Sequence, residues 1–299
     1  MKRVLVLHSW GMGDLIVATP MIKSLALSGY LVDLVLFSKV SVDLVKNSDF
    51  INEIFLVKSK FELLKFYKKY DYLISTAGTN PKKIKLLNLF IKAKKVFAKS
   101  QERDIHRIDM NIEIASPILT KVDKKPYIFI EEDKTILKKY LKKDVKNIGF
   151  AVGGTKGQKF KRWGKFKELI DRFEKANKLI FIGEDELELE DEFKNSDAMI
   201  VKESIKDVIY LISKLDLLVG NDNGLMHIGY ATGIDTVTIF GMTNHKESGG
   251  YNKNNKSVFL DIFCRPCFDP STDRIGCKGL ECLKELKVDE VLKVCKQSL

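Results

Sequence analysis

Short apolar runs alternate with segments of helical periodicity along most of the chain. Runs of apolar and β-branched residues indicate strands, and apolar positions three or four residues apart indicate helices. Strands are predicted at residues 4–7, 31–37, 53–57, 72–75, 95–98, 147–152, 179–182 and 198–201. Helices are predicted at residues 15–27, 61–67, 82–91, 133–141, 165–175 and 205–213. This order predicts an α/β fold with parallel sheets covered by helices.

The length of the chain favours two domains, because its 299 residues exceed the usual size of one. A polar run at residues 142–146 separates two such alternations of strands and helices. We therefore predict two doubly wound domains, residues 1–144 and 145–299, with a cleft between them. Ligands in such folds bind at the carboxyl ends of the strands. For the C-terminal helix, packing back onto the first domain stays an option.

Residues 216–241 concentrate polar side chains around one predicted helix start. The order is strand, turn, short helix and strand, and the turn contains Asp222, Asn223 and Gly224. The start of such a helix presents free backbone N–H groups and the positive end of the helix dipole, so it can hold a phosphate. His227 follows one turn later. The alternative is an ordinary strand-to-helix turn that Asn or Asp caps.

Two further loops follow predicted strands. The first contains Gly11, Gly13 and Asp14, but Ile16 stands where a dinucleotide fingerprint requires its third glycine. Asp14 is either a first-turn acid that interacts with the helix dipole or a general base. The second loop, residues 153–163, begins Gly-Gly-Thr155 and carries Lys156, Lys159, Lys161 and Arg162. It is either a diphosphate-binding loop or a flexible basic loop.

The charge of the chain is uneven. Residues 1–150 contain 28 Lys and Arg against 16 Asp and Glu, a net charge of +12, while the rest of the chain carries −1. The positive charge of residues 1–150 either attracts an anionic partner or comes from lysines that are simply solvated on the surface. The segment 81–98 could form an amphipathic helix against acidic lipid, but a covered helix followed by a strand is the preferred interpretation. No apolar run is long enough to span a bilayer, so we expect a cytoplasmic protein.

The cysteines all lie near the C-terminus. Four of them, Cys264, Cys267, Cys277 and Cys282, have the spacing C-x2-C-x9-C-x4-C. Four thiols this close together could bind zinc or iron. The alternatives are reduced thiols that pack a loop-rich segment and a disulfide that forms only on oxidation.

Five motifs follow one another along the chain: Gly11-Met12-Gly13-Asp14 with Pro20, Lys161-Arg162-Trp163, Asn221 to Gly224 with His227, Phe240-Gly241-x-Thr243, and Gly249-Gly250-Tyr251. Taken in this order, they resemble glycosyltransferase family 9, the heptosyltransferases of lipopolysaccharide core assembly. Cys264-Arg265-Pro266-Cys267 also resembles a segment of the second heptosyltransferase of that pathway. The chain departs from the family pattern at Asn223, Gly164 and Met242, where the family usually has Thr, Pro and Pro.

The resemblance implies two Rossmann-like domains in a GT-B arrangement, with the acceptor on the first and the sugar nucleotide on the second. It implies an inverting transfer from ADP-heptose, with no cofactor and no divalent metal. Asp14 and Lys161 would be catalytic. Donor binding is assigned to Gly13, Thr155, Lys161, Asp222, Asn223, Gly224 and His227.

The implied partners are ADP-heptose and an anionic glycolipid acceptor. The enzyme would contact the inner face of the inner membrane transiently. Two other functions stay open. One is a GT-B transferase or epimerase that uses another sugar nucleotide. The other is a basic nucleic-acid-binding protein, which we disfavour because the Phe and Tyr residues fall mostly at core spacing.

Overall fold

The computed structural model describes residues 1–154, 158–269, 274–277 and 279–299. The chain forms two compact units, Met1–Phe129 and Ile130–Leu299. The sequence analysis placed the domain boundary at 144/145. The difference concerns the helix α5 (Lys134–Tyr140), which contacts α8 (Ile205–Ile212) of the second unit. A hydrogen bond of 2.8 Å from the Tyr140 hydroxyl to Glu203 adds to that attachment.

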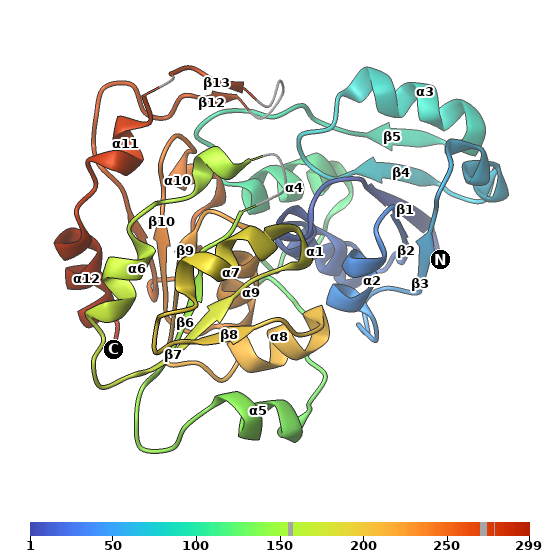
Figure 1. Ribbon diagram of the computed structural model, residues 1–299. Helices are drawn as coiled ribbons and strands as arrows, with labels where there is room; N and C mark the ends of the chain where they lie inside the picture. Colours follow the sequence, from blue (N-terminus) through green and yellow to red (C-terminus); the bar gives the residue numbers. More distant parts are fainter. Residues whose placement is uncertain (155–157, 270–273, 278) are drawn as a thin grey trace. The chain divides into compact units, whose positions relative to one another are not determined.

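The first unit is built on a five-stranded parallel sheet with the strand order β3-β2-β1-β4-β5 (Figure 1). Its strands are β1 (Arg3–His8), β2 (Leu31–Leu36), β3 (Glu53–Leu56), β4 (Tyr72–Ser75) and β5 (Lys95–Phe97). Its helices are α1 (Met12–Leu27), α2 (Lys39–Val45), the 3-10 helix η1 (Lys60–Phe66), α3 (Pro81–Ile91), α4 (Arg107–Ala115) and the 3-10 turn η2 (Ser116–Ile118). On one face of the sheet, Leu5, Leu7 and Leu73 form a buried cluster with Ile84 and Ile91 of α3.

The second unit contains a six-stranded parallel sheet with the order β11-β10-β9-β6-β7-β8. Its strands are β6 (Asn147–Ala151), β7 (Asn177–Phe181), β8 (Met199–Val201), β9 (Leu217–Asn221), β10 (Thr236–Ile239) and β11 (Asn255–Val258). The remaining elements are η3 (Lys159–Lys161), α6 (Phe166–Asp171), η4 (Glu184–Leu189), α7 (Glu190–Phe193), α9 (Gly224–Thr232), α10 (His245–Ser248), the hairpin β12 (Phe268–Asp269) with β13 (Arg274–Ile275), α11 (Glu281–Lys284) and α12 (Val288–Lys296). Both sheets confirm the predicted α/β fold with parallel strands.

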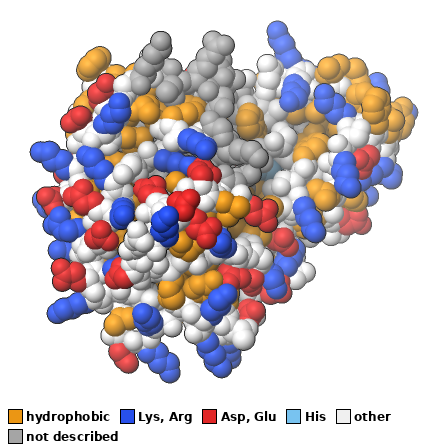
Figure 2. Space-filling view, viewed as in Figure 1, with side chains coloured by type: hydrophobic (Ala, Val, Ile, Leu, Met, Phe, Trp, Pro, Cys, Tyr) orange, Lys and Arg blue, Asp and Glu red, His pale blue; other side chains and the backbone are white. Residues whose placement is uncertain are grey.

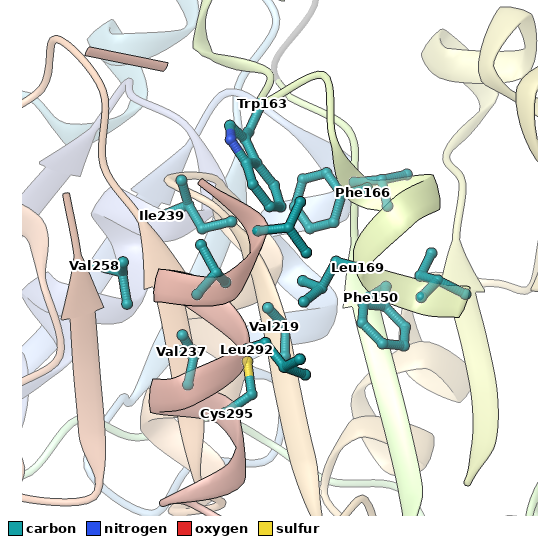
Figure 3. Close-up of a cluster of buried hydrophobic side chains, with 14 of the residues drawn as sticks. Phe150, Trp163, Phe166, Leu169, Val219, Val237, Ile239, Val258, Leu292 and Cys295 are labelled. Carbon is teal, nitrogen blue, oxygen red and sulfur yellow. The ribbon is translucent and has the colours of Figure 1, made fainter. Parts of the chain in front are cut away.

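The pleat of the second sheet divides its side chains between two helical layers, because successive residues of a strand point to opposite faces. Val219 and Val237 join a buried cluster with Leu169 of α6 and with Leu292 and Cys295 of α12 (Figure 3). The C-terminal helix therefore buries its apolar stripe within its own unit.

On the opposite face, α9 lies close against β9. A Cβ on Gly220 would stand only 2.7 Å from the sulfur of Met226 and 2.6 Å from the Cβ of Ala151. Only a glycine lets the helix and the neighbouring strand approach this closely. The close approach brings the start of α9 to the carboxyl end of β6.

The sequence analysis missed several elements. It named no helix between residues 98 and 133, where α4 lies, and it predicted neither α10 nor the β12–β13 hairpin. The helix predicted at residues 61–67 is present as the 3-10 helix η1. Among the helices that the structure describes, none is both long and apolar enough to span a bilayer.

Candidate functional site

The strand order of each sheet reverses at one point, and polar side chains of the predicted site lie at the carboxyl ends of the strands there. In the second unit this topological switch point lies between β6 and β9. Chains that leave neighbouring strands in opposite directions open a crevice at the carboxyl ends of the strands, where doubly wound folds bind ligands. Here β6 runs into the loop 153–163 and β9 runs into Asp222 and the start of α9.

Asn221, at the end of β9, holds both ends of the 153–163 loop. Its amide nitrogen donates to the carbonyls of Val152 at 2.7 Å and Gly153 at 3.1 Å. Its amide oxygen accepts from the backbone N–H of Trp163 at 3.0 Å. The side chain is fully buried. The sequence analysis named Asn221 only as part of the Asn221 to Gly224 motif, because nothing in the local sequence shows that its amide contacts a loop about 60 to 70 residues away.

We expect Asn221→Ala to lower the free energy of unfolding by about 2–4 kcal/mol, since it leaves a buried N–H and a buried carbonyl without partners. Chemical unfolding measures this loss. Asn254→Ala is the matched control, because the Asn254 amide also donates to two backbone carbonyls, of Gly233 and Ile234, but is accessible to water. Equal losses in the two variants would contradict the assigned role of Asn221.

Asn223 caps α9 and ties it to β6. Its amide oxygen accepts from the backbone N–H of Leu225 at 3.0 Å and of Met226 at 3.4 Å. Its nitrogen donates to the carbonyls of Ala151 and Gly153. The turn between β9 and α9 is therefore capped by an Asn side chain, as the alternative in the sequence analysis expected. A bound phosphate would use N–H groups closer to Gly224, or would compete with the Asn223 side chain for those of the first helical turn.

Lys161 and Asp222 face each other across the switch point. The Lys161 ammonium lies 4.0 Å from an Asp222 carboxylate oxygen, and the two side chains are only 14% and 12% exposed. The same ammonium lies 4.8 Å from the ring centre of Phe268. The other Asp222 oxygen accepts a hydrogen bond of 3.3 Å from the Ser248 hydroxyl. A half-buried cation thus stands beside a carboxylate at the start of a helix.

Glu186 is a second acid at this site that the sequence analysis did not single out. Its carboxylate accepts from the backbone N–H of Gly154 at 2.5 Å and of Gly183 at 3.2 Å. Arg162 lies 3.9 Å from it. Neighbouring Glu188 pairs with Lys159 and Arg162, and these cations lower the pKa of its carboxyl group to about 2. The cations of the loop therefore differ, because Lys159 is engaged by Glu188 while Lys161 points to Asp222.

His227 is buried one turn into α9, with its ring edge-on to Tyr230 at 5.4 Å. The Tyr230 hydroxyl is 2.6 Å from that of Thr238 on β10, so this pair ties the helix to the sheet. Burial raises the pKa of Tyr230 well above its ordinary value. His227 therefore sits near Asp222 in sequence but packs within the helix–sheet layer.

The cysteine-rich segment contacts the same end of the sheet through Arg265. Its guanidinium donates to the carbonyls of Gly241 at 2.5 Å and Thr243 at 3.2 Å and stacks over Phe259 at 4.3 Å. His245 also stacks on Phe259 at 4.2 Å. Burial lowers the pKa of His245, and the Arg265 charge adds to that shift.

All the cysteines are free thiols. Burial raises the pKa of Cys267 and raises that of Cys282 to about 11, so both favour the neutral form. In the described part of the chain, which includes all four thiols of the predicted cluster, no group of three or more His, Cys, Asp or Glu side chains is placed to hold a metal ion.

In the first unit, Asp14 lies in the first turn of α1 and pairs with Arg107. Its Oδ1 accepts from the Arg107 guanidinium at 2.5 Å. Arg107 begins α4, and Asn111 fixes that helix by donating to the Arg107 carbonyl and accepting from the N–H of Ala77. The Asp14 carboxylate is therefore held in place at the carboxyl end of β1, yet it stays about one-third exposed.

Buried His8 joins β1 to β4 beside Asp14. Its Nε2 lies 3.2 Å from the Gly11 carbonyl, and its Nδ1 lies 3.1 Å from the Thr76 hydroxyl. Burial lowers the pKa of His8, although the charge of Asp14 opposes this shift. The neutral imidazole then carries its proton on Nε2, because a carbonyl can only accept. His8 thus supports the Gly11–Asp14 turn.

The predicted site residues divide between the two units. Lys161, Asp222, Asn223 and Gly224 come together at the switch point of the second sheet. Asp14 and Gly13 lie in α1 of the first unit. Thr155, and with it Lys156, lies outside the described residues.

Comparison with known proteins supports the resemblance to glycosyltransferase family 9. A family model described as "Glycosyltransferase family 9 (heptosyltransferase)" matches residues 89–276. Lipooligosaccharide heptosyltransferase 2 of Campylobacter jejuni subsp. jejuni serotype O:6 is 26% identical over 331 residues, which is 99% of this chain and 99% of that protein.

Two solved structures share the fold. The glycosyl transferase family 9 from Veillonella parvula has a TM-score of 0.81 at 19% identity, covering 99% of this chain and 97% of its own. E. coli ADP-heptose lps heptosyltransferase II has a TM-score of 0.76 at 16% identity, covering 100% and 98%. These likenesses confirm the GT-B assignment of the two-sheet fold. Because the family model matches more than half of the chain, this protein belongs to glycosyltransferase family 9 (heptosyltransferase) and is a glycosyltransferase.

Proposed function

We propose that this protein transfers a heptose from ADP-heptose to a hydroxyl group of a lipopolysaccharide core acceptor, with inversion at the anomeric carbon. The observation that carries the proposal is the Lys161–Asp222 pair at the start of α9, at the switch point of the second sheet. The names of the Campylobacter jejuni and E. coli relatives support the heptose donor and the lipopolysaccharide acceptor.

Asp14 is the general base of this proposal. As the acceptor oxygen attacks the anomeric carbon, its proton passes to the Asp14 carboxylate and the bond from that carbon to the diphosphate oxygen breaks. ADP leaves from the opposite face with the electron pair. Arg107 acts as a positioning residue, because its guanidinium holds one oxygen of the carboxylate. General base catalysis of this kind typically contributes about 10²- to 10⁴-fold in rate.

Lys161 neutralises the charge that develops on the leaving diphosphate. A cation fixed in a poorly hydrated site stabilises the transition state more than the ground state, because the charge is greatest as ADP departs. The half-buried ammonium beside the helix start meets this condition. On this proposal the donor displaces part of the Lys161–Asp222 contact, and Asp222 then binds hydroxyl groups of the sugar. Gly13, Thr155, Asn223, Gly224 and His227 stay assigned to donor binding, and the reaction needs no divalent metal and no cofactor.

The basic first half of the chain receives the acceptor on this proposal. An anionic glycolipid acceptor suits its net charge of +12 over residues 1–150. The enzyme would then work in the cytoplasm, at the inner face of the inner membrane. A sugar-nucleotide epimerase or a transferase with a uridine donor remains the second candidate on the same fold.

Thermal unfolding with ADP, UDP, GDP or NAD, in the presence of EDTA, tests the donor site. A ligand that binds only the native state raises stability by RT ln(1 + [L]/Kd), which is about 2.7 kcal/mol when the ligand is at 100 times its Kd. We expect ADP to raise Tm and the other three nucleotides to leave it unchanged. A rise in Tm with UDP alone would show that the donor is a uridine nucleotide sugar instead of ADP-heptose. A rise in Tm with ADP that EDTA abolishes would contradict metal independence.

A further inference from the structure

Large apolar side chains are exposed on two neighbouring elements of the first unit, η1 and α3. Among them are Phe61, which is 73% exposed, Leu64 at 51%, Leu86 at 61% and Leu89 at 57%. Single exposed leucines are ordinary on a protein surface, but several together indicate an interaction site. We call the exposed residues of η1 and α3 the lysine–leucine surface. The sequence analysis expected this helix to be covered, and its outer face is not.

The geometry of α3 shows that these leucines point away from the core of their unit. Ile84 and Ile91, two turns apart, are buried in that core. At about 100° per residue, Leu86 and Leu89 lie about 200° and 140° around the helix from Ile84. The helix therefore has a second apolar stripe on its outer face, which folding of this unit does not use.

Contacts between η1 and α3 join their exposed side chains into one surface. The Phe61 ring lies edge-on to Phe90 of α3 with 6.4 Å between centroids. The backbone N–H of Lys68 donates to the carbonyl of Ile91 at 2.7 Å. These contacts hold η1 and the residues just after it against the C-terminal end of α3.

Cations dominate the surroundings of this surface. Residues 58–95 contain 11 lysines but only two acids, Glu62 and Asp71. Lys82, Lys83 and Lys85 are exposed on the same helix as the two leucines. Figure 2 shows Lys and hydrophobic side chains next to each other over the region where Figure 1 places α3.

We propose that the lysine–leucine surface docks the protein on a bilayer that contains anionic phospholipids. Apolar side chains that project from a ring of lysines match such a bilayer, because the leucines enter the boundary of the acyl chains while the ammonium groups stay among the phosphates. A second copy of this chain would bring like charges together. Nucleic acid would leave the leucines without an apolar partner. The proposal takes up the membrane-bound acceptor of the proposed function, but it does not depend on the donor chemistry.

Sedimentation with vesicles tests the proposal. The full-length protein is mixed with phosphatidylcholine vesicles that either contain or lack phosphatidylglycerol. We expect binding to the anionic vesicles only. Leu86→Gln with Leu89→Gln should weaken that binding about tenfold or more, and Lys82→Gln with Lys83→Gln and Lys85→Gln should weaken it about a hundredfold.

The controls are other exposed residues of the same unit. Leu27→Gln removes an exposed leucine, and the triple change of Lys39, Lys121 and Lys125 to Gln removes the same charge elsewhere. Both should bind like the wild type. Every variant should keep its ADP-induced rise in Tm, and the leucine variants should keep their transfer to a soluble, delipidated acceptor. Failure of lipid docking and failure of the proposed function then give different results.

Three results would overturn the proposal. The first is wild-type binding that the leucine and lysine changes on α3 leave intact, or that their controls weaken equally. The second is self-association of the wild type that Leu86→Gln with Leu89→Gln abolishes, which would make a second copy the partner. The third is displacement of the protein from vesicles by a plain oligonucleotide at lower concentration than the lipid, which would make nucleic acid the partner.

Discussion

Asp14→Asn is expected to lower kcat by about 10²- to 10⁴-fold while ADP binding and the KM for the donor stay near their wild-type values. The amide keeps the shape of the side chain and can still accept a hydrogen bond from Arg107, but it cannot take the proton of the acceptor hydroxyl. The loss should therefore appear in the chemical step. Initial rates of acceptor-dependent ADP release measure it.

Asp109→Asn is the control for this change. Asp109 is also an acid in the first turn of a helix, but it pairs with Lys124 on the surface. Its replacement should leave kcat within about twofold of the wild type, because an exposed ion pair contributes little. A wild-type kcat for Asp14→Asn would show that Asp14 is not the general base. A fall in ADP binding would show that Asp14 acts on the donor instead.

Lys161→Met is expected to lower kcat/KM by about 10²- to 10³-fold, which is the usual cost of removing one group that stabilises developing negative charge. Methionine has an apolar stem of similar length, so the change removes mainly the ammonium charge and its contact with the Phe268 ring. Lys161→Arg should recover part of the activity. Donor-saturation kinetics, together with the ADP-induced rise in Tm, separate lost binding from a slower chemical step.

Lys159→Met is the matched control, since Lys159 and Lys161 belong to the same 3-10 turn. Lys159 is well exposed and pairs with Glu188, whereas Lys161 is half-buried beside Asp222. We expect Lys159→Met to change kcat/KM by about twofold at most. Equal losses in the two variants would mean that the loop attracts the donor only through its general charge.

The sequence predicted the layered parts of the fold well, because their signals are local. Nearly continuous apolar runs indicated the buried parallel strands, and glycines with turn formers placed Asp14 and Asp222 at the carboxyl ends of β1 and β9. The α4 helix was missed because its apolar residues Ile108, Met110, Ile112 and Ile114 alternate with polar ones, a spacing that is typical of a strand. Its start is also marked only by a cap at His106, which is an unusual capping residue.

The side chains that arrange the site could not be predicted in the same way, because their partners are distant in sequence. Arg107 meets Asp14 across 93 positions, and Asn221 meets Trp163 across 58. The cap that Asn223 provides also changes which N–H groups are available to a phosphate. The sequence indicates that Asn223 places an amide oxygen near the start of α9. Only the structure shows that this oxygen accepts hydrogen bonds from the backbone of α9 itself.

The outward leucines of α3 illustrate a further limit. A helix in a doubly wound fold is expected to cover the sheet, so the apolar residues of segment 81–98 were assigned to the core. Ile84 and Ile91 do lie there, but Leu86 and Leu89 fall on the opposite side of the helix. An apolar pattern of this kind indicates a helix without showing which apolar residues the fold leaves exposed.

The anomeric configuration of the product is the most direct test of inverting heptosyl transfer without a metal. The protein would be incubated with ADP-heptose and a lipopolysaccharide core acceptor in EDTA, and the new glycosidic bond would be examined by NMR. We expect a heptosyl product with the configuration opposite to that of the donor, formed together with one ADP for each new glycosidic bond. A product that retains the donor configuration, or no transfer until a divalent metal is restored, would contradict this expectation.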